Sequence, residues 1–172
     1  MNIRQVDRAG DRDLEDLCDV LIDCVENGAS VSFMQPMTRD KAMAFWRGVA
    51  ASAGRGERVL FVAQEGGRIV GTVQVVFDMP ENQPHRGDVC KMLVHGSMRR
   101  RGIGEALMRA AEDASRRAGK SLLVLDTASA DAERLYERCG FRRVGTIPNY
   151  ALLPQGGYCD TVYFYKELSA AG

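Results

Sequence analysis

The chain has 172 residues, a length that suits one domain with a substantial core. Its 23 Lys plus Arg balance its 23 Asp plus Glu, and a net charge of zero argues against a dedicated nucleic-acid-binding protein. No stretch approaches the ~20 apolar residues of a membrane span, and the charged segment 1–19 lacks the apolar core of a signal peptide. The five cysteines show no C-x-x-C spacing, which is typical of reduced thiols, so we expect a cytoplasmic protein.

The first part of the chain has the pattern of one strand followed by two helices. Apolar and polar residues alternate over 2–7, which predicts a strand. Apolar residues then recur at three- and four-residue steps over 14–25, as on one face of a helix, and Asn27-Gly28 follows as an end signal. A second helix is predicted to begin near the capping residue Thr38.

Three predicted strands come next. Segments 58–64 and 68–77 are β-rich, and Glu65-Gly66-Gly67 between them is a hairpin signal. A polar loop over 79–87 is expected to lead into a third strand, the apolar run 89–94.

A glycine-rich turn lies between this apolar run and a further predicted helix. Its sequence is Arg99-Arg100-Arg101-Gly102-Ile103-Gly104. Glycines let the backbone approach a ligand closely, and the unpaired N–H groups of a first helical turn attract negative charge. Three arginines add charge and bidentate donors, so we expect the turn to bind a phosphate or pyrophosphate.

Two familiar phosphate-binding patterns match this turn poorly. A P-loop needs Lys followed by Ser or Thr after its second glycine, whereas Glu105-Ala106 follows Gly104. A dinucleotide-binding fingerprint would have a third glycine or an alanine where Leu107 stands, and it would lie near the start of its domain.

The segment after this helix continues the alternation of strand and helix. Residues 121–126 form a continuous apolar run, the pattern of a parallel strand buried on both faces. A short helix over 132–141 is closed by Gly140. Two more strands are predicted at 142–150 and 158–168, and we expect 169–172 to be a frayed end.

Two motifs in this half of the chain resemble those of the GNAT superfamily of N-acetyltransferases. The pattern R-x-x-G-x-G, matched by Arg99, Gly102 and Gly104, resembles the coenzyme A pyrophosphate loop. The run A-x-x-L-Y-x-x-x-G-F over 132–141 is similar to the GNAT motif in which a helical tyrosine faces the cofactor sulfur. The resemblance implies an α/β (α+β) fold. Its mixed, mostly antiparallel sheet would have six or seven strands, helices on both faces, and a splayed parallel pair of central strands.

The resemblance also implies acetyl-CoA as the acetyl donor and no metal. The pantetheine arm would enter between the two parallel strands and pair with the backbone of one of them. An N–H near Leu93 or Val94 could stabilise the oxyanion. Ser129 stands where the superfamily often has an asparagine that contacts the pantetheine, and its hydroxyl can still form a hydrogen bond. The expected cofactor-binding residues are Met92, Leu93, Val94, Arg99, Arg100, Arg101, Gly102, Ile103, Gly104, Glu105 and Ser129.

Candidate catalytic groups follow from the chemistry of amide formation. Tyr136 is the expected acid, because a phenol of pKa ~10 is protonated at neutral pH and can return a proton to a thiolate. Asp88 and Asp126 are expected at the ends of the two central strands, where either could act as the base. Asp126 could instead cap the following turn, and Asp88 could instead bind the ammonium group of the substrate.

The first two helices overlie the acceptor side of the cleft in GNAT proteins. The resemblance therefore associates Phe33, Met34 and Trp46 with the substrate, and ordinary packing on the sheet is the alternative role of Trp46.

The leading functional hypothesis is an acetyl-CoA-dependent N-acetyltransferase acting on the primary amine of a small molecule, either an amino acid or an antibiotic-like compound. Segments 85–94 and 125–127 look like the tabtoxin-resistance branch of the superfamily. A protein or peptide N-acetyltransferase and a catalytically silent coenzyme A-binding sensor are the alternatives. The sequence leaves open whether the last strands form a homodimer.

Overall fold

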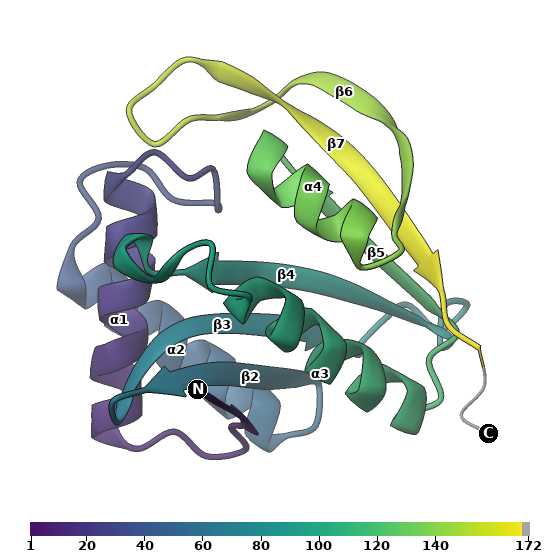
Figure 1. The fold of residues 1–172 in the computed structure, drawn as a ribbon, viewed down its shortest axis with the longest axis horizontal. Helices are drawn as coiled ribbons and strands as arrows, with labels where there is room; N and C mark the ends of the chain where they lie inside the picture. Colours follow the sequence, from purple (N-terminus) through teal and green to yellow (C-terminus); the bar gives the residue numbers. More distant parts are fainter. Residues whose placement is uncertain (170–172) are drawn as a thin grey trace.

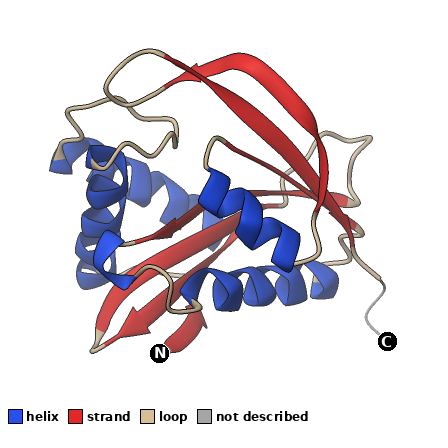
Figure 2. Cartoon of the chain, turned by 45° about the horizontal axis from the view of Figure 1, so that its top comes forward, coloured by secondary structure: helices blue, strands red, loops and turns tan. Residues whose placement is uncertain are grey.

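The computed structural model describes residues 1–169, and these residues build one seven-stranded mixed sheet with helices on both faces (Figure 1, Figure 2). The strand order is β1-β2-β3-β4-β5-β7-β6, and β4 with β5 is the parallel pair. The predicted fold class is therefore confirmed. The elements are β1 (Asn2–Gln5), α1 (Asp11–Glu26), α2 (Arg39–Gly54), β2 (Arg58–Glu65), β3 (Arg68–Val76), β4 (Arg86–Val94), a 3₁₀ turn η1 (Gly96–Met98), α3 (Ile103–Arg117), β5 (Leu122–Thr127), α4 (Ala130–Arg138), β6 (Arg142–Leu152) and β7 (Tyr158–Glu167).

The sheet separates two hydrophobic cores. Along β2, Leu60 and Val62 face α1 and α2, whereas Phe61 and Ala63 face the core shared with α3. Successive side chains of a strand point to opposite faces, so a run of apolar residues can fill both cores at once. The continuous apolar strands of the sequence are explained by this sandwiched position.

A β-bulge interrupts β4 where it pairs with β3. Thr72 pairs with Leu93 and Gln74 pairs with Cys90, so Lys91 and Met92 together stand opposite one residue of β3. Lys91 has a φ of +49°, which is unusual for a residue with a side chain. The bulge bends the second half of β4 and changes the direction of its side chains.

The parallel pair β4 and β5 holds together over a short length. The register pairs are Arg86 with Leu122, Gly87 with Leu123 and Asp88 with Val124. Beyond Asp88 the two strands diverge, as Figure 1 shows, and α4 follows β5 on the far side of the opening. The predicted splayed pair is thus present, and one backbone edge of β4 is left without a strand partner over residues 89–94.

Several element boundaries differ from the sequence-based ones, and two of the differences have a clear structural cause. β4 begins at Arg86, inside the segment expected to be a loop, because its first three residues pair with β5. β6 continues to Leu152 past Pro148, since a register irregularity between Ile147 and Ala151 accommodates the residue that cannot donate a ladder hydrogen bond. The predicted frayed end lies outside the described residues except for Ser169. No helix within residues 1–169 is long and apolar enough to cross a membrane.

Candidate active site

The predicted anion-binding turn forms the N-terminus of α3. Gly102 precedes the helix in the left-handed conformation with a φ of +78°, which glycine adopts without steric cost. The first hydrogen bond of the helix runs from the Ala106 N–H to the Gly102 carbonyl at 3.1 Å. The N–H groups of Ile103, Gly104 and Glu105 precede this bond and have no partner within the helix, so they can bind an anion.

The three arginines of the turn have different surroundings. The Arg101 guanidinium forms an ion pair with Glu65 at 2.7 Å, and the Arg99 Nε donates to the Val94 carbonyl at 3.3 Å. Arg100 is exposed, and within residues 1–169 its side chain has no hydrogen-bond or ion-pair partner. Of the three, Arg100 is therefore the side chain that is free to meet a phosphate.

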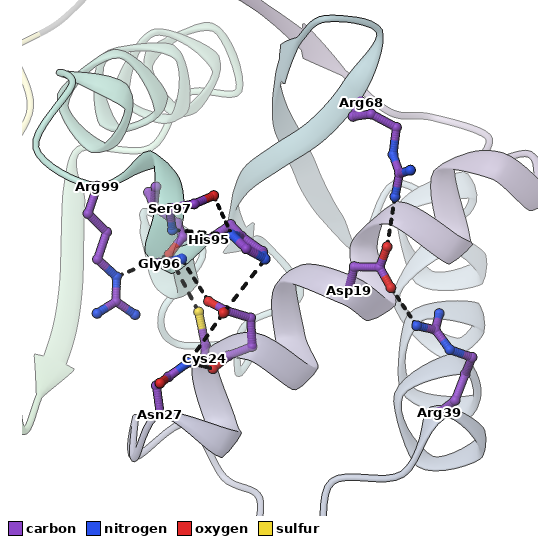
Figure 3. Close-up of polar contacts among 11 residues, drawn as sticks. Asp19, Cys24, Asn27, Arg39, Arg68, His95, Gly96, Ser97 and Arg99 are labelled. Atoms are coloured by element: carbon purple, nitrogen blue, oxygen red, sulfur yellow. Dashed lines mark hydrogen bonds and ion pairs between the residues drawn. The ribbon is translucent and has the colours of Figure 1, made fainter.

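The chain between β4 and this turn is tied to the last turns of α1 (Figure 3). Asp23 Oδ2 accepts a hydrogen bond of 2.7 Å from the Gly96 N–H, and Asp23 Oδ1 lies 3.6 Å from His95 Nε2. The Cys24 sulfur contacts the Val94 carbonyl at 3.6 Å. This carbonyl, expected to pair with the cofactor, thus has two partners from the protein.

Gly104 lies where α3 packs against Leu135 of α4. A Cβ atom at this position would stand 2.9 Å from Leu135 Cδ2 and 3.5 Å from Met92 Cε. The glycine therefore permits α3 to pack against both the helix of Tyr136 and the bulged part of β4.

Tyr136 is held rigidly on α4. Its ring is 6 % exposed and lies 6.0 Å from the ring of Phe141 and 6.1 Å from that of Phe164. Burial raises the pKa of the phenol, and the negative charge of Asp126 raises it further. The hydroxyl therefore stays protonated throughout the neutral and mildly alkaline range. Ser129 is the N-cap of this helix, with its Oγ accepting from the Ala132 N–H at 3.3 Å.

Asp88 and Asp126 lie on one face of the sheet, where β4 and β5 separate. Asp88 is in register with Val124, and Asp126 follows two residues later on the same face. Burial raises the pKa of the Asp88 carboxyl, its ion-pair partner Arg86 lowers it, and the charge of Asp126 raises it. Asp126 Oδ2 accepts a hydrogen bond of 2.7 Å from the Thr161 hydroxyl on β7. Both aspartates lie within strands, and Asp126 bonds to the sheet instead of capping a turn.

Three further polar residues lie on this face near Cys90 and were not predicted as site residues from the sequence: Lys91, Gln74 and Arg58. Burial raises the pKa of the Cys90 thiol, the positive charges of Lys91 and Arg58 lower it, and the negative charges of Asp88 and Asp126 raise it. Gln74 lies directly across from Cys90 on β3. A lysine inside the apolar run 89–94 was a visible signal for Lys91, whereas nothing local marked Gln74 or Arg58.

The connection between α1 and α2 lies above this polar group. Phe33 is half-buried and packs edge-on against Phe45 at 5.2 Å, and Met34 is 39 % exposed. Trp46 has no exposed surface and belongs to the core between α1, α2 and the sheet. The substrate role expected of Trp46 is therefore corrected to a packing role, and its neighbour Phe45 is the helix residue near the site.

Comparisons with known proteins decide the family. Residues 15–141 match the family model described as the acetyltransferase (GNAT) family. This chain belongs to the GNAT acetyltransferase family. A protein of Azospirillum brasilense, described as an uncharacterized N-acetyltransferase in the hisH-hisA intergenic region, is 30% identical over 141 residues, which are 81% of this chain and 82% of that protein.

Solved structures share the GNAT fold at low sequence identity. The ribosomal-protein-alanine N-acetyltransferase of Brucella melitensis is 22% identical with a TM-score of 0.80, covering 98% of this chain and 100% of that one. The phosphinothricin acetyltransferase of Sinorhizobium meliloti, solved with acetyl-CoA, is 17% identical with a TM-score of 0.81, covering 98% and 88%. One neighbour is named for a protein acceptor and the other for a small molecule, so the shared fold leaves the acceptor open.

Proposed function

We propose that this protein is an acetyl-CoA-dependent N-acetyltransferase whose acceptor is the primary amine of a small molecule, an amino acid or an antibiotic-like compound. The observation that carries the proposal is the placement of Asp88 and Asp126 on one face at the point where β4 and β5 separate. An ammonium group bound between the carboxylates of Asp88 and Asp126 would lie next to the gap between β4 and β5, where the thioester of acetyl-CoA would enter. The tyrosine that can protonate the leaving thiolate lies on the helix that follows β5.

The acetyl donor would be held at both of its ends. Its pyrophosphate would accept hydrogen bonds from the N–H groups of Ile103, Gly104 and Glu105, with Arg100 adding positive charge. Its pantetheine arm would lie along the free edge of β4 at Met92 and Leu93, in the manner of an added strand. Among residues 1–169, the three N–H groups have no partner within α3, and β4 has no strand partner on this edge over residues 89–94.

Each chemical step has a residue suited to it. Asp88 is the better placed base, because burial raises the pKa of its carboxyl and so makes it more basic than an exposed aspartate. It would remove a proton from the ammonium group, and the nitrogen lone pair would then attack the thioester carbon. An N–H near Leu93 or Val94 would donate to the oxyanion that forms. As the C=O bond re-forms and the C–S bond breaks, Tyr136 would give its proton to the thiolate and regain one from the attacking nitrogen through water.

The test is a panel of acceptors supplied with acetyl-CoA, with release of the coenzyme A thiol as the readout. The panel includes amino acids, aminoglycoside-like amines, simple alkylamines and short peptides with a free N-terminus. Faster release with small amines than with peptides is the expected result. Release with peptides alone would replace the small-molecule acceptor with a protein acceptor, and tight binding of acetyl-CoA without release would indicate a sensor.

The proposal extends to a homodimer formed through the edge strand β6. Apolar side chains are exposed along this hairpin, with Val144 67% and Tyr158 71% exposed, and β6 has one free edge at the end of the sheet. Two antiparallel copies of β6 would pair with each other and cover these residues. Light scattering after gel filtration should give twice the monomer mass of 18.9 kDa, and a monomer would contradict the dimer.

A further inference from the structure

Two positively charged groups near the paired aspartates have no carboxylate partner within residues 1–169. The Lys91 Nζ lies 3.1 Å from the Ser32 hydroxyl and 5.8 Å from the centre of the Phe45 ring. The Arg58 Nε donates to the Ser52 hydroxyl at 2.9 Å, and its Nη1 donates to Gln74 Oε1, also at 2.9 Å. Both side chains are only partly exposed to water, and neither forms an ion pair with a carboxylate of residues 1–169. Each can therefore bind the anionic group of a ligand.

The Arg58 guanidinium is held in a fixed orientation by these two hydrogen bonds. Gln74 has no exposed surface, and its amide must present its oxygen to Arg58 because a guanidinium can only donate. The amide nitrogen then remains without a partner among the described residues. The Nη2 of Arg58 likewise makes no hydrogen bond within residues 1–169, so it is available to a ligand.

Lys91 shares one space with Arg58 and the aspartates. Arg58 bonds to Gln74, and Gln74 pairs with Cys90, the residue that precedes Lys91, so these residues lie on one part of the sheet face. The charges of Asp126 and Arg58 also affect the pKa of Lys91. The β-bulge that contains Lys91 directs its side chain to the same face as Cys90, toward the α1–α2 connection where Ser32 lies. Burial lowers the pKa of Lys91, because it disfavours the charged form of the amine.

Resting on the N-acetyltransferase function proposed above, we infer that the acceptor is a zwitterion: Asp88 and Asp126 bind its ammonium group, and Lys91 with Arg58 binds a carboxylate on the same molecule. The acceptor class is thereby narrowed to amino acids and close analogues. An amine without an acidic group would form no ion pair with Lys91 or Arg58, and it would lose the charge-assisted hydrogen bonds that a carboxylate gains there. The bulge has a defined role in this arrangement, because it directs the Lys91 side chain toward Ser32 on the α1–α2 connection, above the face that carries the aspartates.

The test compares wild type with Lys91→Met on matched acceptors. Each amino acid of a panel is paired with its own carboxamide, and kcat/KM is measured for both by thiol release at saturating acetyl-CoA. Met keeps the length and apolar stem of Lys91, so its packing on Phe45 is retained. The preference of each enzyme is its kcat/KM for the amino acid divided by its kcat/KM for the carboxamide. Both enzymes act on the same two amines, so the effect of amine basicity cancels when the wild-type preference is divided by that of Lys91→Met.

The wild-type preference for the carboxylate should exceed that of Lys91→Met by about tenfold or more, the usual effect of one charge-assisted hydrogen bond. Lys120→Met is the matched control, because Lys120 also lies over an aromatic ring, that of Phe77 at 5.4 Å, and its Nζ bonds to the Phe77 and Pro84 carbonyls. This control should keep the wild-type preference.

Two results would overturn the inference. An equal preference for the carboxylate over the carboxamide in wild type and in Lys91→Met would show that Lys91 does not bind the carboxylate. Its role would then be only to pack against Phe45 and bond to Ser32. Efficient turnover of simple alkylamines with no turnover of any amino acid would remove the carboxylate from the acceptor while leaving the N-acetyltransferase function intact. Absence of release with every amine would instead contradict the proposed function itself.

Discussion

The carboxylate of Asp23, near the end of α1, accepts a hydrogen bond of 2.7 Å from the backbone N–H of Gly96, the residue that follows β4 and His95. This bond joins the acceptor-side helix to the chain that leads into the anion-binding turn at Gly102. The geometry of the turn is therefore set partly by a residue far away in the sequence.

Removing this anchor by Asp23→Ala should weaken acetyl-CoA binding. Without the hydrogen bond from Gly96, the segment over 95–101 would be less ordered in the free protein. Acetyl-CoA would then have to order it on binding, which reduces the net free energy of binding. Charge-assisted hydrogen bonds contribute about 1.5–3 kcal/mol, so we expect the Kd of acetyl-CoA, measured by calorimetry, to rise about tenfold. Asp19→Ala is the control, because Asp19 lies on the same helix and pairs with Arg39 and Arg68, remote from the turn (Figure 3). An unchanged Kd in Asp23→Ala, or an equal rise in Asp19→Ala, would contradict an anchoring role.

A side chain at position 104 should abolish the stabilisation of the protein by acetyl-CoA. In Gly104→Val the new Cβ would stand 2.9 Å from Leu135 Cδ2, so either this side chain or the first turn of α3 must shift. The added side chain would also crowd the N–H groups proposed to bind the pyrophosphate. Overpacking of this kind costs about 1–3 kcal/mol of stability, which should leave a folded protein. The measurement is the rise in Tm on adding acetyl-CoA, which reports binding to the folded state. The double variant Gly104→Val with Leu135→Ala should recover part of the lost stability, and a wild-type ligand shift in Gly104→Val would count against the assignment of the turn.

Loss of the Tyr136 hydroxyl should lower kcat and leave the affinity for acetyl-CoA unchanged. Phe keeps the packing of the ring against Phe141 and Phe164, and the hydroxyl forms no hydrogen bond within residues 1–169 that the fold would lose. General acids contribute ~10²–10⁴-fold, so Tyr136→Phe should lose at least an order of magnitude in kcat. Tyr158→Phe, on a side chain 71% exposed, is the matched control and should have wild-type kcat. A fully active Tyr136→Phe would exclude the phenol as the acid.

The two aspartates should differ in their effect on the pH profile. Burial raises the pKa of Asp88 above its ordinary value, and the carboxylate is competent as a base only above that pKa. Asp88→Asn should therefore lower kcat/KM most near neutral pH and less at alkaline pH, where free amine already exists. If Asp126 only binds the ammonium group, Asp126→Asn should raise KM and retain kcat. Wild-type profiles in both variants would leave water as the proton acceptor.

The pKa of Asp88 also predicts the direction of a stability effect. A carboxyl whose folded-state pKa is raised binds its proton more tightly in the folded protein, so its ionisation lowers stability as pH rises from the unfolded-state value through the folded-state value. Asp88→Asn removes this ionisation. The Tm of Asp88→Asn minus the Tm of wild type should therefore increase as pH is raised from 3 to 7. A decrease in this difference would contradict the raised pKa.

The features found from the sequence were those encoded by residues close together in the chain. The turn at Gly102, the helix of Tyr136 and the apolar strands each have a local pattern, and their order agrees with the fold that the GNAT resemblance implied. Lys91 escaped notice because its direction depends on a bulge, and a bulge is defined by pairing with another strand.

Other parts of the site depend on contacts between distant residues. Asp23 bonds to Gly96, 73 residues away, and Asp126 bonds to Thr161, 35 residues away. Neither contact produces a pattern among neighbouring residues of the sequence. The GNAT resemblance associated Trp46 with the substrate, and the helical pattern of the sequence does not show which neighbours cover this side chain. The structure shows that it is fully buried.

The most direct test of the account is amine-dependent release of thiol from acetyl-CoA by the wild-type protein and by the double variant Asp88→Asn, Asp126→Asn. The acceptor nitrogen is expected to lie between these two carboxylates, so wild type should release thiol only when a small primary amine is present. Mass spectrometry should then find the acetyl group on that amine. The double variant should still bind acetyl-CoA, shown by its rise in Tm, and should lose at least an order of magnitude in kcat/KM at neutral pH. Wild-type release that no amine increases, or a double variant as active as wild type, would contradict the account.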